Sequence, residues 1–248
     1  MNIRCLLLGI GLCAALSPFV AVTKAHAQAA ILVALFGDKV ASENFFFSLK
    51  GGLNWSSLDG LDGTSVRRGP NFGMLATIRL SDRWSIVPEF APLSVKGAED
   101  ITLRPTGNPE LDNLLANATS SQSTLKYIDI PVVVQFRPHP RGYIGAGPQV
   151  AYLLSAKDTF RAKVNEDDDL SFDEDIKDAL NSWEFGMVIE AGFVLLPTRQ
   201  GPGLTLYGRY ARGLNDIVKD NDGDAVYSSV WQFGLSLPFL EKPSVEDE

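Results

Sequence analysis

The chain has 248 residues, of which 45% are hydrophobic and 21% charged, a balance too apolar for a disordered protein and too polar for a bundle of membrane helices. Its formal net charge of −8 argues against nucleic-acid binding, because contacts with phosphates require a basic surface. The two cysteines, Cys5 and Cys13, and the two histidines, His26 and His139, are too few for most metal sites and for most enzymes that pair a nucleophile with histidine.

The first 27 residues have the organisation of an export signal. A positive charge at Arg4 precedes an apolar run over residues 5–22, and Ala25-His26-Ala27 is an A-x-A cleavage site. We therefore predict that residues 1–27 are removed on export, a retained membrane anchor being the alternative. Cleavage would remove both cysteines, so no disulfide would hold the exported protein together.

From residue 47 onward the dominant pattern is alternation of apolar residues with other residues. In residues 183–195 every odd position is apolar, whereas the even positions include Glu184, Gly186 and Glu190. This period of two predicts β-strands with one apolar face. The pattern occurs in eight segments: 47–55, 72–80, 84–91, 127–136, 143–152, 183–195, 204–211 and 231–239.

The connections between these segments alternate in length. The short ones are 81–83, 137–142 and 196–203, and the long ones are 56–69, 96–123, 155–182 and 211–230. Short turns at one end and long loops at the other are typical of outer-membrane barrels. The sequence therefore predicts an all-β fold, an eight-stranded antiparallel up-and-down transmembrane β-barrel with short periplasmic turns and long extracellular loops. Both chain ends would lie in the periplasm.

This fold sets the expected boundaries. Residues 44–239 form the outer-membrane barrel, residues 28–43 a periplasmic segment in which a short helix is one option, and residues 240–248 an acidic tail. Within the loop 155–182, Ser171 and Glu174 match a capping box, which predicts a short helix there. The acidic runs of this loop lack the glycine and the closing glutamate of an EF-hand, and we interpret them as solvated charges rather than a calcium site.

The polar faces of the strands indicate which side of the barrel contacts lipid. They contain mainly glycine, serine, threonine and glutamine and few charges, too few for the outside of a water-soluble barrel. We therefore expect the apolar faces to contact outer-membrane lipid and the polar faces to line a narrow lumen. The predicted lumen charges are Lys50, Arg79, Glu89, Asp129, Glu184, Glu190 and Arg209.

The four tryptophans, Trp55, Trp84, Trp183 and Trp231, all fall at the ends of predicted strands. In outer-membrane barrels such tryptophans form aromatic girdles at the two lipid interfaces. Core tryptophans, the alternative, would be scattered along the strands. The positions therefore predict a girdle.

One lumen contact can be predicted from the turn 196–203. If this turn is symmetric, Glu190 lies opposite Arg209 on the next strand and the two form a hydrogen-bonded ion pair. The alternative is a register shifted by a bulge, in which Arg209 binds Glu89 or water instead.

Three prolines, Pro88, Pro131 and Pro148, lie inside predicted strands. Each lacks the N–H that a strand donates to its neighbour, and this loss is costly in lipid. We expect bulges or lumen water to compensate for them.

Several motifs occur in the order and at the spacing of a known family. They are Lys50-Gly51-Gly52-Leu53-Asn54, Leu80-Ser81-Asp82-Arg83-Trp84 with Pro88-Glu89, Tyr127-Ile128-Asp129-Ile130-Pro131 and Gly145-Ala146-Gly147-Pro148-Gln149-Val150. Over about residues 45–239 the chain resembles the PorT-like outer-membrane β-barrel family. The resemblance implies an eight-stranded barrel without an enzymatic domain, and it implies no particular ligand. Because a tail follows Phe239, this residue is the expected element for the barrel assembly machinery.

We expect a function without catalysis, cofactor or metal. His139, the one histidine outside the export signal, lies in a predicted periplasmic turn, away from the outer rim where a surface enzyme would need its base and nucleophile. The favoured hypothesis is a structural or interaction barrel that displays acidic extracellular loops, with an unknown extracellular or periplasmic partner. A small pore or transport-associated barrel is the alternative, although side chains nearly fill an eight-stranded lumen. A surface enzyme is the third hypothesis.

Overall fold

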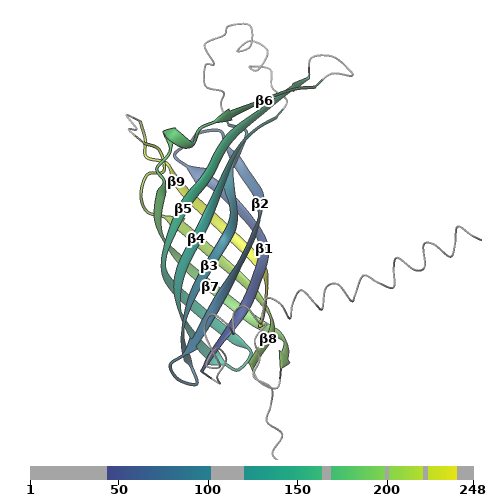
Figure 1. Ribbon diagram of the computed structural model, residues 1–248, viewed down its shortest axis with the longest axis vertical. Coiled ribbons are helices and arrows are strands. Elements are labelled where there is room, and N and C mark those ends of the chain that lie inside the picture. Colours follow the sequence, from purple (N-terminus) through teal and green to yellow (C-terminus); the bar gives the residue numbers. More distant parts are fainter. Residues whose placement is uncertain (1–43, 102–119, 164–168, 199–200, 220–222, 239–248) are drawn as a thin grey trace, which may run out of the picture.

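The computed structural model describes residues 44–101, 120–163, 169–198, 201–219 and 223–238, which form nine β-strands and one 3₁₀ helix (Figure 1). In chain order these elements are β1 (Phe45–Asp59), β2 (Ser65–Arg79), β3 (Trp84–Glu99), β4 (Ser120–His139), β5 (Gly142–Lys163), β6 (Asp169–Asp175), η1 (Lys177–Ala179), β7 (Trp183–Thr198), β8 (Gly201–Gly213) and β9 (Tyr227–Pro238). Within the described ranges, no helix has the length and apolar character needed to cross a membrane. The expected export signal, N-terminal helix and acidic tail, together with Phe239, lie outside the described residues.

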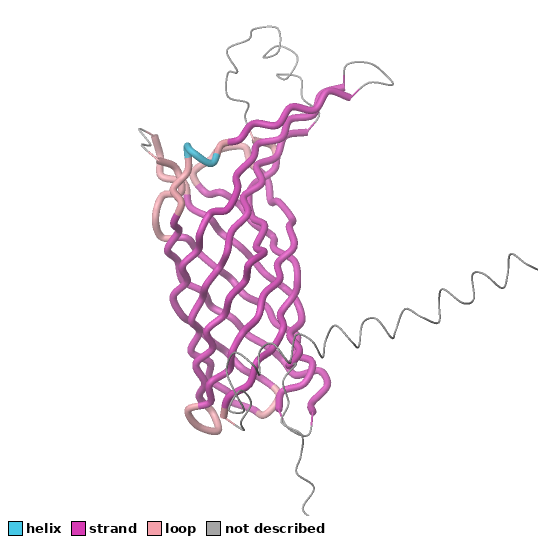
Figure 2. Tube along the Cα trace, in the orientation of Figure 1, coloured by secondary structure: helices cyan, strands magenta, loops and turns pink. Residues whose placement is uncertain are grey.

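Eight of the strands close into a barrel. β1 pairs with β9 and β4 pairs with β5, so the antiparallel ring of β1–β5 and β7–β9 is complete. Figures 1 and 2 show these strands tilted around a tall, narrow wall. The predicted eight-stranded antiparallel barrel is thereby confirmed. We call the end with the β1–β2, β3–β4, β5–β7 and β8–β9 connections the long-loop end, and the opposite one the short-turn end.

The strands run further toward the long-loop end than the sequence indicated. β4 and β5 contain 20 and 22 residues, and the β1–β2 connection is reduced to residues 60–64 instead of 56–69. Gly60 and Gly63 in this connection have φ of 106° and 76°, which glycine adopts without strain. Alternation marks only the part of a strand that has lipid on one side, so the polar extensions carry no such signal.

A β-bulge in β3 changes which residues face the lumen. Within residues 90–94, β3 has one residue more than β2 and β4, and its register against both neighbours shifts there. Pro92, which has no N–H to donate, lies inside this bulge. Before the bulge the odd-numbered Glu89 is buried, and after it the even-numbered Lys96 is buried.

No bulge occurs at the three prolines expected to cause one. The β4–β5 register is the same on both sides of Pro131, and the β5–β7 register is the same around Pro148. β3 and β4 likewise keep one register past Pro88. Of the two expected compensations, bulges or lumen water, the registers exclude bulges at these three positions, whereas Pro92 does lie in a bulge.

The short helix expected from the capping box is also wrong in position. Ser171 and Glu174 both lie in β6, where Phe172 pairs with Phe160 of β5. The helical turn η1 begins only at Lys177. Strand pairing and the packing of Phe172 override the local helix signal.

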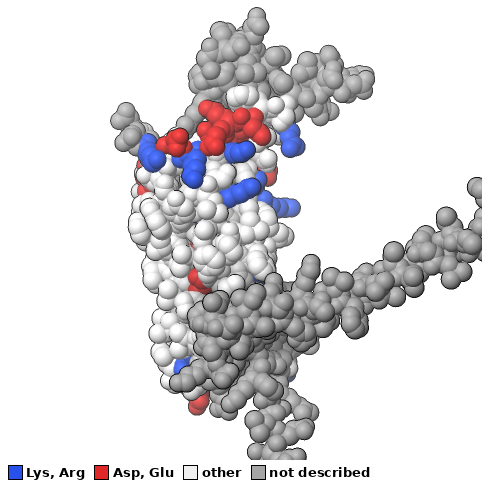
Figure 3. Space-filling view, in the orientation of Figure 1, with Lys and Arg blue, Asp and Glu red and all other residues white. Residues whose placement is uncertain are grey.

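The two faces of the barrel wall differ in polarity. On β7, the odd-numbered Phe185 and Ile189 are 54% and 58% exposed. The even-numbered Val188 and Glu190 are 0% and 6% exposed. Figure 3 shows a mostly uncharged wall, with charged side chains gathered toward the long-loop end. The apolar face of the strands therefore points outward and the polar face inward.

Candidate functional site

The barrel interior contains six of the seven predicted lumen charges. Lys50, Glu89, Asp129, Glu184, Glu190 and Arg209 are each at most 6% exposed. Arg79 is half-buried near the short-turn end, with its guanidinium carbon 5.3 Å from the centre of the Phe46 ring. The interior charges form two groups: the central network (Lys50, Glu89, Glu190 and Arg209) and, nearer the long-loop end, the upper network (Lys96, Asp129 and Glu184).

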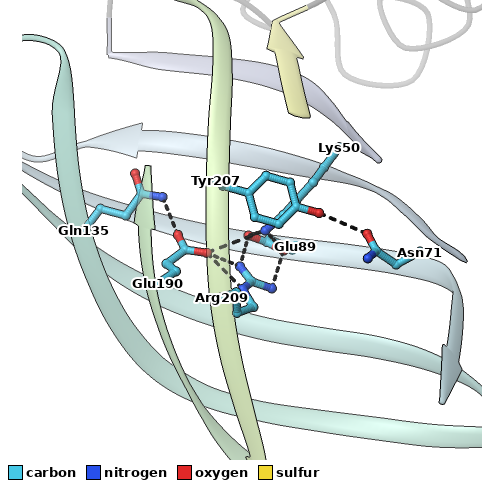
Figure 4. A network of polar contacts seen from close by, with 7 residues as sticks. All are labelled: Lys50, Asn71, Glu89, Gln135, Glu190, Tyr207 and Arg209. Carbon is cyan, nitrogen blue, oxygen red and sulfur yellow. Dashed lines mark hydrogen bonds and ion pairs between the residues drawn. The ribbon is translucent and has the colours of Figure 1, made fainter. Parts of the chain in front are cut away.

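The central network crosses the lumen, because it joins Arg209 on β8 to Glu89 on β3, a strand that does not pair with β8. Arg209 donates from Nε to Glu190 Oε2 at 2.9 Å and from Nη1 to Glu89 Oε2 at 2.9 Å (Figure 4). Lys50 Nζ lies 3.2 Å from Glu89 Oε1 and 3.6 Å from Glu190 Oε2. The β7–β8 register places Glu190 opposite Arg209. The predicted pair is confirmed, and the alternative partner Glu89 binds the same guanidinium.

The central network is electrically balanced, with two cations and two carboxylates. Buried charges are tolerated when they are paired and their remaining hydrogen-bonding groups are satisfied. Gln135 Nε2 donates to Glu190 Oε1 at 2.8 Å, and Lys50 Nζ lies 4.0 Å from the centre of the Tyr207 ring. These neutral neighbours, which the sequence pattern did not assign to the network, add a hydrogen bond and a cation–π contact to the four buried charges.

The upper network contains a lysine that sequence reasoning missed. Lys96 Nζ lies 3.0 Å from Asp129 Oδ1, 3.7 Å from Glu184 Oε1 and 4.5 Å from the centre of the Tyr127 ring. The sequence placed Lys96 at the start of a long loop, yet it is 1% exposed. The bulge turns it inward, and Pro92 within an apolar segment was the available signal.

The cavities that the described residues line around these networks are small. A cavity of about 10 Å³ lies between them, lined by residues that include Lys50, Glu89, Asp129 and Arg209. A second cavity, of about 30 Å³, lies nearer the short-turn end beside Gln135 and other residues. A cavity of the first size holds about one water molecule. The described side chains therefore fill the lumen at the level of the central network.

Apolar side chains close the lumen at the long-loop end. We call this cluster the apolar cap; it contains Leu125, Leu153, Phe160, Ile176, Leu180, Ile217 and Val226. Two connections meet over it, since Asn181 N donates to Ile217 O at 2.8 Å and Lys219 N donates to Ala179 O at 2.9 Å. Asn181 Nδ2 also donates to Asp216 O at 2.9 Å. The β6–β7 and β8–β9 connections thus hold each other in place above the lumen.

The four tryptophans lie beside aromatic rings of neighbouring strands. Ring centres are 4.8 Å apart for Trp84 and Phe136, 4.9 Å for Trp183 and Tyr152, 4.9 Å for Trp231 and Tyr210, and 5.5 Å for Trp55 and Phe233. Trp84 and Trp183 begin their strands. Trp55 and Trp231 instead lie four residues inside β1 and β9, because these strands extend further than expected. The expectation that all four mark strand ends is wrong for these two.

Within the described residues, the histidine considered for catalysis lies away from the long-loop end. His139 ends β4 at the short-turn end and is exposed, with Nδ1 accepting a hydrogen bond from Arg141 N at 3.2 Å. In the described part of the chain, no group of three or more His, Cys, Asp or Glu side chains is placed to hold a metal ion. The carboxylates of the central and upper networks are bound to lysine or arginine.

Comparison with known proteins identifies a family and a set of similar folds. The family model described as outer membrane protein beta-barrel domain matches residues 36–219. Ail, the attachment invasion locus protein of Yersinia pestis, has 13% sequence identity and a TM-score of 0.42, covering 79% of this chain and 99% of Ail. Neisserial surface protein A has 11% identity and a TM-score of 0.41, with 79% and 97% covered. OprG from Pseudomonas aeruginosa has 13% identity and a TM-score of 0.35, with 80% and 97% covered. No curated protein sequence matches the chain.

Proposed function

Since the chain belongs to the outer membrane protein beta-barrel domain family, we propose that it is a non-enzymatic barrel of the outer membrane that presents interaction surfaces at its long-loop end. The observation that carries this proposal is the filled interior. Arg209 binds carboxylates on β3 and β7 at once, and the apolar cap closes the lumen above. A barrel filled in this way is suited to hold surface segments in place rather than to pass solutes.

A small pore is the second candidate, and the polar lining of the lumen favours it. Ser48, Thr77, Gln135, Gln149 and Gln232 are buried and point inward among the charges. A solute path along this lining would require both the central network and the apolar cap to open. A pore therefore requires two rearrangements, the opening of the central network and the opening of the apolar cap. An interaction barrel requires neither.

Several finer assignments belong to the same proposal. The motifs around Lys50, Trp84, Asp129 and Pro148 support a PorT-like member of the family. We further propose a cleaved export signal at residues 1–27, a periplasmic segment at 28–43 and an acidic tail at 240–248. Outer-membrane lipid and the barrel assembly machinery are the expected general partners, and the lumen charges and tryptophans act structurally.

Conductance distinguishes the interaction barrel from the pore. The refolded exported chain is inserted into planar lipid bilayers beside a general porin as positive control. We expect no sustained single-channel openings from this protein at voltages where the porin conducts. Regular openings of constant amplitude would contradict the proposal and support the pore.

The orientation of the barrel can be tested on the two loops that flank β2. Asp62 lies in the β1–β2 connection and Asp82 in the β2–β3 turn, and both are exposed. With Asp62→Cys and Asp82→Cys in separate variants, a membrane-impermeant maleimide should label position 62 on intact cells and position 82 only after the cells are opened. The reverse pattern would show that the long-loop end faces the periplasm.

A further inference from the structure

β6 has one edge that no described strand covers. It pairs antiparallel with β5, from Lys157 opposite Asp175 to Lys163 opposite Asp169, and it is last in the sheet order. Figures 1 and 2 show it at the long-loop end, beyond the closed wall of the barrel. The backbone N–H and C=O groups along such an edge can pair with another extended segment.

The side chains of β6 fix which face an added strand would share. Phe172 packs against the apolar cap, whereas Asp173 and Asp175 on the opposite face are exposed. Asp173 Oδ1 accepts a hydrogen bond from Thr159 Oγ1 at 2.8 Å, and Asp175 Oδ1 accepts one from Lys177 N at 3.0 Å. Each carboxylate keeps a second oxygen. β6 is therefore held on β5 with an acidic face toward solvent.

The spacing of these carboxylates matches the repeat of a β-strand. Asp173 and Asp175 are two residues apart, so an added strand would place alternate side chains directly opposite them, with Cβ atoms about 4.5–5.5 Å away. Opposite charges stabilise such cross-strand pairs and like charges destabilise them. Figure 3 shows acidic side chains at this end of the molecule, with lysine and arginine side chains beside them. The chemistry selects lysine or arginine at alternate positions of the added strand.

We propose that the free edge of β6 is a docking site for an extended basic segment of a partner protein, which adds to the sheet as a strand with lysine or arginine opposite Asp173 and Asp175. The inference rests on the proposed function, because it names a partner for the interaction surface. A second copy of this chain fits poorly, since two acidic β6 strands side by side would place carboxylates opposite carboxylates.

The test uses the exported chain in lipid nanodiscs and a fluorescent eight-residue peptide of alternating lysine and threonine. Fluorescence anisotropy at physiological salt should show saturable binding. The double variant Asp173→Asn with Asp175→Asn should weaken binding about three- to tenfold, the effect of two lost cross-strand charge pairs. The control variant Asp62→Asn with Glu99→Gln loses the same charge at the same end and should stay within about twofold of the wild type.

Strand addition is separated from simple charge attraction on the peptide side. The same peptide with every backbone nitrogen methylated keeps its charge but has no N–H to donate, and we expect at least about tenfold weaker binding. A peptide of alternating glutamate and threonine should not bind. These comparisons use the wild-type protein, so they hold even if the double variant fails to fold.

Four results would overturn the inference. Equal binding of the methylated peptide would leave only charge attraction, and equal binding of the glutamate peptide would remove the basic specificity. Self-association of the wild type that Asp173→Lys alters would assign the edge to a second copy. If the lysine peptide does not bind and the barrel does not conduct, this inference fails while the proposed function stands. If the barrel conducts, the proposed function fails instead.

Discussion

The membrane-spanning part of the barrel and its long-loop end have opposite polarity. In the spanning part the outer face is apolar, as at Phe185 and Ile189, and the interior carries Glu190 and Arg209. At the long-loop end the interior is mainly apolar, with Phe160 1% exposed, and charged side chains such as Lys157 lie outside. In the spanning part the strands are apolar outside and polar inside, as in a membrane protein. At the long-loop end they are polar outside and apolar inside, as in a water-soluble protein, because the surroundings of the wall change from lipid to water.

The two regions are also stabilised by different interactions. The spanning part depends on charge pairs that cross the lumen, such as Arg209 with Glu89. The long-loop end depends on apolar burial and on hydrogen bonds between connections, such as those of Asn181. Changes in the first region should therefore affect the whole barrel, whereas changes in the second should affect the cap alone.

The largest effect is expected from the central network. Arg209→Gln leaves Glu89 and Glu190 with only Lys50, which should cost about 3–5 kcal/mol of unfolding free energy if burial is complete and less if lumen water reaches the site. Urea titration in liposomes measures the loss. Arg79→Gln, at a half-buried position, is the matched control and should cost about 1 kcal/mol or less.

A double-mutant cycle shows whether the pair itself accounts for this loss. Combining Glu190→Gln with Arg209→Gln should reveal a coupling free energy of about 1–3 kcal/mol, the range for residues in direct contact. A coupling energy indistinguishable from zero would contradict the central network.

A smaller effect is expected on the lipid-facing side of the spanning part. Ile189→Arg places a charge on the apolar outer face and should cost about 2–4 kcal/mol if the position is near the bilayer midplane. Val66→Arg, also on an exposed side chain but close to the long-loop end, should cost about 0–1 kcal/mol. Equal losses for the two variants in the liposome titration would remove the distinction between the two regions.

The smallest effect is expected at the cap. Asn181→Ala removes the side-chain hydrogen bonds to Asp216 O and Val218 O and should lower local stability by about 0.5–1.5 kcal/mol without changing global unfolding. Hydrogen exchange at the Ile217 amide, which donates to Val226 O, should become faster. Ser57→Ala, which removes an exposed hydrogen bond to Asp59, should leave this exchange unchanged.

Local pattern was sufficient for the barrel and for one specific contact within it. Alternation identified all eight wall strands because each has lipid on one side and lumen on the other. The register of Glu190 with Arg209 could be predicted because only a short turn separates β7 from β8. A short connection limits the number of possible pairings, so sequence distance alone nearly determines the contact.

Contacts between side chains of different strands were harder to predict. Gly192 faces the lumen and Ile189 faces lipid. The alternation of β7 alone therefore predicts that Gly192→Ser is tolerated better than Ile189→Arg. In the structure Tyr143 covers this glycine, and a Cβ at Gly192 would lie 2.1 Å from Tyr143 Cε1. Serine would have to displace the ring, which the alternation pattern of β7 alone does not indicate.

The sequence by itself determined the strand period, the closed antiparallel fold and the inward side of most charged residues, since these follow from the partition of alternate side chains between lipid and lumen. The tertiary structure alone decided the inward turn of Lys96, the binding of Glu89 to an arginine 120 positions away, the apolar cap and the acidic edge of β6. The first two depend on a bulge and on the width of the closed ring. The apolar cap and the acidic edge of β6 lie outside the lipid layer. There the strands do not separate lipid from a polar lumen, so the sequence does not alternate between apolar and polar residues.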